Sequence, residues 1–151
     1  MLRVDEKHWI KTGIEYVDGV QNLSAVVTHD YSDWSVIPLP NPPDVLHLRV
    51  ERSKEAIQIF YLNEASNYAM LRMTYLPYET LQVGVMCASP DGDGFEVTFE
   101  DYQLILPMPK GEGILEESRF GYSKALSCRR YSLSLNFFKH CVYFFAFGVH
   151  H

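Results

Sequence analysis

Three carboxylates, Glu96, Glu100 and Asp101, lie close together in a segment that alternates like a strand. Two carboxylates that flank a glycosidic bond can hydrolyse it, one as nucleophile or base and the other as acid. Glu96 and Glu100 share a strand face, which at about 3.3 Å per residue places them about 13 Å apart. That separation exceeds both the roughly 5.5 Å of a retaining pair and the roughly 9.5 Å limit of an inverting pair. We therefore predict that the chain has no catalytic residues and is not an enzyme.

Metal and cofactor chemistry also lack a matching pattern. The acidic segment 91–94 alternates Asp and Gly, but a calcium loop needs further oxygen ligands and a closing Glu at its twelfth position. A turn between strands explains the segment. The histidines have no metal-ligand spacing, and no Gly-rich phosphate loop is present. The sequence predicts no metal and no cofactor.

Ligand binding is the remaining chemistry, because two strand-like segments carry charged and aromatic residues opposite an apolar face. Ile10 and Ile14 lie on one face of the first segment, and Leu48 and Val50 on one face of the second. A further charge, Arg72, interrupts an otherwise apolar strand. The candidate ligand-binding residues are those that face away from the apolar side, together with this arginine: Trp9, Lys11, Glu15, His47, Arg49 and Arg72.

Such a face suits a polar ligand groove. Aromatic rings lie flat against the C–H faces of sugars, while Arg, Lys and Glu hydrogen-bond hydroxyl or carboxylate groups. The alternative is an ordinary solvated face in which charges of both signs form weak cross-strand ion pairs. The role of Trp34 also has two alternatives, since it could belong to the groove or be a buried anchor.

The elements that position these residues are strands. Asp18–Gly19 is a strong hairpin signal, because a type I′ turn needs positive φ. Short alternating segments recur at intervals of about ten residues, which favours an antiparallel β-sandwich or barrel. The expected strands are 8–17, 22–28, a run around Trp34, 45–52, 56–62, 68–76, 81–89 and 95–106.

The charge distribution divides the chain of 151 residues near residue 106. Residues 1–106 contain 7 basic and 16 acidic residues, whereas 107–151 contain 6 basic and 3 acidic residues. We expect a domain over 1–106 and a tail over 107–151 that is partly docked or disordered. The net charge of −6 argues against nucleic acid or an anionic membrane as partner.

Compartment signals point to the cytoplasm. The first residues lack the apolar core of a secretory signal, and three cysteines cannot all pair. The most apolar stretch, 131–149, is interrupted by Lys139 and His140 at its middle, so we predict no membrane span.

Six blocks in register carry a family resemblance over about residues 1–105. They read WIKTGIEYVDG (9–19), LSAVVT (23–28), SDWS (32–35), YAMLR (68–72), VGVMCASP (83–90) and GFEVTFED (94–101). They resemble a domain-of-unknown-function family that includes the regulation-of-enolase proteins. That family belongs to the concanavalin A-like lectin and glucanase superfamily.

The resemblance implies an antiparallel jelly-roll β-sandwich that here is incomplete at its N-terminal side. Part of 131–149 would then cover the gap, or the tail would remain mobile. The resemblance also implies a non-enzymatic intracellular recognition module that binds a carbohydrate-like ligand on a sheet face. The alternative is a protein-binding regulator of a metabolic enzyme such as enolase, and a weaker one is a remnant glycoside hydrolase. The oligomeric state stays open.

Overall fold

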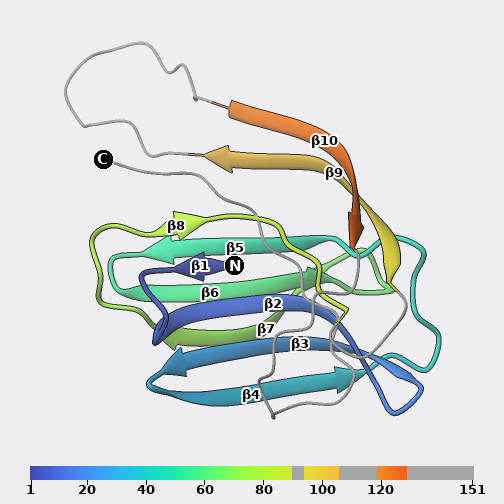
Figure 1. The fold of residues 1–151 in the computed structure, drawn as a ribbon, viewed down its shortest axis with the longest axis horizontal. Coiled ribbons are helices and arrows are strands. Elements are labelled where there is room, and N and C mark those ends of the chain that lie inside the picture. Colours follow the sequence, from blue (N-terminus) through green and yellow to red (C-terminus); the bar gives the residue numbers. More distant parts are fainter. Residues whose placement is uncertain (90–93, 106–118, 129–151) are drawn as a thin grey trace.

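The computed structural model describes residues 1–89 and 94–105, together with the backbone of 119–128 (Figure 1). These residues form strands and loops, and they include no helix that could cross a membrane. All the strand pairs are antiparallel and fall into a five-stranded sheet, a three-stranded sheet and a two-stranded hairpin.

The five-stranded sheet has the order β4-β3-β2-β1-β8. Its strands are β1 (Leu2–Arg3), β2 (His8–Val17), β3 (Val20–His29), β4 (Tyr31–Pro38) and β8 (Gln82–Val83).

The turn between β2 and β3 is the predicted Asp18–Gly19, with φ of 50° and 82°. Both values are positive, as a type I′ turn requires. The turn fixes the register of the hairpin, in which Val17 pairs with Val20 and Lys11 with Val26.

The three-stranded sheet has the order β5-β6-β7, with β5 at Leu48–Ser53, β6 at Ala56–Leu62 and β7 at Tyr68–Tyr75. The β6–β7 pairing contains a β-bulge, because Ile59 pairs with Arg72 but Phe60 pairs with Met70. The extra residue is Leu71.

These two sheets pack face to face around one core. The five-stranded sheet contributes Ile10, Ala25 and Val27, and the three-stranded sheet contributes Ile57 and Ile59. The segment that leaves β7 adds two further buried leucines, Leu76 and Leu81. The structure therefore confirms the predicted all-β class and the antiparallel β-sandwich.

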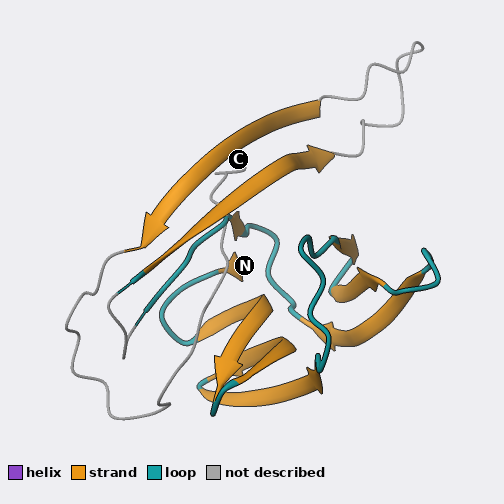
Figure 2. Cartoon of the chain, turned by 90° about the vertical axis from the view of Figure 1, so that its right-hand side faces the viewer, coloured by secondary structure: helices purple, strands orange, loops and turns teal. Residues whose placement is uncertain are grey.

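The third unit is a hairpin of β9 (Phe95–Ile105) and β10 (Arg119–Cys128). Figures 1 and 2 show it as a long arm beside the two sheets. The sequence did not predict β10, because residues 116–130 have a weak pattern that becomes a strand only by pairing with β9. The expected turn at 91–93 and the expected docking of 131–149 lie outside the described residues.

Two strand predictions were too long. The expected strand 81–89 is reduced to β8, because its described neighbour β1 offers only Leu2 and Arg3 for pairing. The expected strand 45–52 starts only at Leu48. Pairing with β6 begins there, just after the backbone carbonyl of His47 accepts a hydrogen bond from Leu62 at 3.0 Å.

Candidate functional site

The face of the five-stranded sheet that points away from the core carries three of the predicted site residues. Trp9, Lys11 and Glu15 alternate along β2 with the fully buried Ile10, so they project to the opposite side. We call this side the outer face of the five-stranded sheet. On it, Lys11 pairs with Val26 of β3, which in turn pairs with Trp34 of β4.

Trp34 therefore belongs to the same face as Lys11, since directly opposed residues in antiparallel strands project to one side. Its side chain is 42% exposed, so it is not the buried anchor that the sequence left as one possibility. Ser24, which the sequence did not single out, lies on this face too and is 1% exposed. The hairpin signal at Asp18–Gly19 could have revealed Ser24, because it sets the register of β2 and β3.

The functional groups on this face contact one another in a row. The Lys11 Nζ lies 5.4 Å from the centroid of the Trp9 ring, a cation–π distance. The same nitrogen lies 3.7 Å from the Glu15 Oε1, and the two side chains are only 11% and 3% exposed. The Trp9 Nε1 donates to the backbone carbonyl of Glu6 at 3.2 Å, which fixes the ring. These contacts hold the three side chains in fixed positions relative to one another.

Glu15 is the least satisfied member of this row. Its Oε1 is buried and receives no hydrogen bond, because 3.7 Å to Lys11 is too long for one. Burial raises the pKa of the Glu15 carboxyl, and the charge of Lys11 and hydrogen bonds with Ser24 and Trp34 oppose the rise. The Glu15 Oε1 can therefore accept a further hydrogen bond.

A surface hollow of about 480 Å³ adjoins the row, and its lining includes Met1, Arg3, Glu6 and Trp9. Arg3 pairs with Trp9 across β1 and β2, so both side chains are on the outer face. The Met1 amine donates to the Gly84 carbonyl at 3.1 Å, and its burial lowers the pKa of the amine to about 5. Arg3 and Glu6 thus place both charge signs around the hollow.

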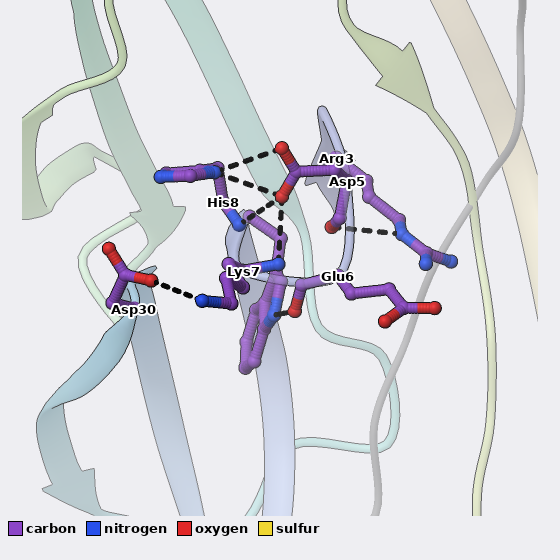
Figure 3. A network of polar contacts seen from close by, with 7 residues as sticks. Arg3, Asp5, Glu6, Lys7, His8 and Asp30 are labelled. Carbon is purple, nitrogen blue, oxygen red and sulfur yellow. Dashed lines mark hydrogen bonds and ion pairs between the residues drawn. The ribbon is translucent and has the colours of Figure 1, made fainter.

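Polar contacts order the loop between β1 and β2, which contributes Glu6 to the lining of the hollow (Figure 3). The Asp5 Oδ1 accepts hydrogen bonds from the backbone N–H groups of Lys7 and His8, both at 2.8 Å, and lies 2.9 Å from the His8 Nδ1. These contacts, with the His8 side chain first, lower the pKa of the Asp5 carboxyl. A Lys7–Asp30 ion pair of 3.0 Å ties the loop to the end of β3.

Arg49 lies on the other side of the sandwich. It pairs with Phe60, on the face of the three-stranded sheet opposite the buried Ile57 and Ile59. Its guanidinium carbon is 4.9 Å from the centroid of the Phe60 ring and 4.4 Å from that of the Tyr68 ring. The exposed His47 precedes β5 on this sheet.

Arg72 points between the two sheets. It pairs with the buried Ile59, and its guanidinium bonds to the Asp33 carboxylate and the Ser35 hydroxyl of β4. This contact links the sheets at one edge of the sandwich. The structure therefore brings Trp9, Lys11 and Glu15 together, but it places His47, Arg49 and Arg72 elsewhere.

The other acidic candidates lie apart from this site. Glu96 and Glu100 are exposed on β9, which pairs with β10. A β-bulge interrupts that pairing near Asp101, whose φ is 51°. Within the described part of the chain, no group of three His, Cys, Asp or Glu side chains could hold a metal ion.

The fold and the outer face define an antiparallel β-sandwich with a polar, aromatic surface on one sheet. A family described as "Protein of unknown function (DUF1349)" matches residues 1–106. The chain belongs to this family, which confirms the predicted resemblance.

Among its curated relatives is the Regulation of enolase protein 1 of Saccharomyces cerevisiae, 33% identical over 111 residues, which are 73% of this chain and 56% of the relative. An uncharacterized protein of Emericella nidulans is 27% identical over 106 residues, 67% of this chain and 53% of that protein. The chain thus spans about half the length of these relatives. A crystal structure of a functionally unknown Saccharomyces cerevisiae protein aligns with a TM-score of 0.47 and 32% identity, over 52% of this chain and 42% of that one.

Proposed function

We propose that the chain is a non-enzymatic cytoplasmic recognition module that binds a carbohydrate-like, polyhydroxylated ligand on the outer face of the five-stranded sheet. The observation that carries this proposal is the buried Glu15 Oε1, which lies beside Lys11 and receives no hydrogen bond. A buried acceptor without a donor costs about 1–3 kcal/mol. A ligand hydroxyl group would supply the missing donor.

The surroundings of Glu15 fit such a ligand. Trp34 is 42% exposed on the same face, so part of its ring is accessible to the C–H face of a sugar. The Lys11 ammonium can donate to a second hydroxyl group. Both charge signs are present at the neighbouring hollow, at Arg3 and Glu6, so the site has donors and acceptors without a strong net charge.

A glycan array followed by fluorescence titration tests this function. The chain has two tryptophans, so Trp9→Phe leaves Trp34 as the single reporter on the proposed site. We expect a saturable change in Trp34 emission in the titration and, on the array, loss of binding by Trp34→Ala and weaker binding by Glu15→Gln. Tyr75→Ala, at a tyrosine that is 59% exposed on the three-stranded sheet, is the matched control and should bind normally.

Failure of every glycan to bind, or equal binding by Trp34→Ala, would remove the carbohydrate proposal. Turnover of a glycoside by the wild type that Glu15→Gln abolishes would overturn the non-enzymatic proposal and favour a remnant glycoside hydrolase.

A second candidate function is binding to a metabolic enzyme such as enolase as a regulator. It draws on the name of the yeast relative and on the exposed apolar residues of the three-stranded sheet, among them Tyr68, Met70 and Met73 at 43%, 50% and 61% exposure. Aromatic residues and Met are enriched in protein interfaces. Calorimetry with purified enolase tests it: Met73→Glu should abolish binding, and binding that resists this change would contradict the proposed surface.

A further inference from the structure

The sandwich has sheet edges at which backbone groups meet no other described strand. The outermost strands are β4 and β8 in one sheet and β5 and β7 in the other. An edge strand presents free N–H and C=O groups, and proteins usually guard such edges with bulges, prolines or inward-pointing charges.

Three of these four edges are guarded or short. β7 contains the bulge at Leu71 and the inward-pointing Arg72. β4 carries the partner of that arginine, Asp33, and ends at Pro38. β8 has only two residues.

β5 differs from the other edges. Its six residues pair with β6 without a register shift, and the strand contains no proline. β5 is therefore the regular, open edge of the two packed sheets.

The charges on β5 are arranged so that two copies of the strand can pair with opposite charges facing one another. Arg49 and Glu51 flank Val50, and all three side chains are accessible, Val50 being 39% exposed. In an antiparallel pair of two β5 strands with a twofold axis at Val50, Arg49 stands opposite Glu51 of the partner subunit. The same symmetry places Glu51 opposite Arg49 of the partner subunit, so both cross-strand pairs join opposite charges.

The Arg49 side chain is already held in place for this pairing. Its guanidinium lies over the Phe60 and Tyr68 rings at 4.9 and 4.4 Å, and its Nε is 3.1 Å from the Glu51 Oε1. The side chain is still 46% exposed, which leaves it accessible to a second carboxylate. A side chain ordered before association loses less entropy when the complex forms.

We propose that a second copy of this chain binds along β5, antiparallel and in register at Val50. The product is a continuous six-stranded sheet with a four-charge cluster of two Arg49–Glu51 pairs. This dimer is independent of the proposed ligand function, because Trp9, Lys11 and Glu15 lie on the other sheet.

Sedimentation of the full chain over a concentration series tests the proposal. We expect the wild-type mass to rise towards that of a dimer. Arg49→Glu and Glu51→Arg each place like charges opposite one another, so each should weaken the dimer at least about tenfold. The double variant R49E/E51R restores opposite charges and should recover most of the affinity.

Lys7→Glu is the matched control, because it makes the same charge change on a 71% exposed side chain in the loop between β1 and β2, away from β5. It should leave the dimer unchanged. Hydrogen exchange should show β5 amides becoming protected as the concentration rises, while circular dichroism confirms that each variant is folded.

A wild type that stays monomeric up to its solubility limit would overturn the dimer. The proposed register would be wrong if the folded double variant R49E/E51R dimerised as weakly as the single variants. It would also be wrong if Lys7→Glu weakened the dimer as much as Arg49→Glu does.

Discussion

The two sheets of the sandwich have outer faces of opposite character. On the five-stranded sheet, Lys11 and Glu15 are charged but only 11% and 3% exposed. On the three-stranded sheet, Met70, Met73 and Tyr75 are apolar or aromatic but 50%, 61% and 59% exposed. Both faces depart from the usual rule that charged groups are exposed and large apolar groups are buried.

The difference corresponds to the two kinds of recognition that we propose. Buried charges next to an unsatisfied acceptor suit a small ligand with hydroxyl groups. A buried acceptor that lacks a hydrogen bond carries a large desolvation cost, which a ligand hydroxyl group would remove. Exposed Met and Tyr side chains suit a macromolecular surface, because their contribution comes from the apolar area that is covered. The comparison therefore separates the two proposed functions by face.

The largest effect should follow from removing one charge of the buried pair. Lys11→Met keeps an unbranched stem but leaves the Glu15 carboxylate without its cation, so we expect a loss of about 3 kcal/mol at neutral pH. Arg49→Ala, at the 46% exposed pair on the other face, should cost less than about 1 kcal/mol. Urea unfolding of both variants measures the difference.

The double variant Lys11→Met/Glu15→Gln removes both charges and should regain most of the lost stability, because no uncompensated charge remains. Equal losses for Lys11→Met and Arg49→Ala would show that the two faces are electrostatically alike, which would contradict the comparison.

A smaller effect should follow from cutting the link between the two sheets. Arg72→Met removes the contacts with Asp33 and Ser35 but keeps most of the buried stem. Because Asp33 is 68% exposed and solvent weakens the pair, we expect a loss of about 1 kcal/mol.

In Arg72→Met, hydrogen exchange should show that the backbone amides of β4 and β7 lose protection. Lys7→Met, which removes the exposed pair with Asp30, is the control and should cost about 0.3 kcal/mol. If both variants lose the same stability, Arg72 is an ordinary surface charge and not a link between the sheets.

The sequence predicted the sandwich well where local signals were strong. Alternation gave β2 with its observed bounds, and Asp18–Gly19 gave its hairpin with β3. Alternation alone could not say which sheet a strand joins, so Arg49 was grouped with Trp9 although they lie on different sheets. It also could not foresee that the β-bulge at Leu71 turns Arg72 towards Asp33. Such placements depend on contacts between residues distant in the sequence.

The smallest effect concerns the pH dependence of the outer face of the five-stranded sheet. Burial raises the pKa of Glu15 from its ordinary value of 4.5, so the folded state holds the proton more tightly than the unfolded state does. Stability from this group is fully present below pH 4.5 and is lost as the pH rises through the raised pKa of Glu15.

The variant Glu15→Gln cannot ionise, so it should not lose stability in this way. Urea unfolding across that range should therefore show the variant gaining stability relative to the wild type as pH rises. Parallel curves for the wild type and Glu15→Gln would mean that Glu15 is solvated like a surface carboxylate.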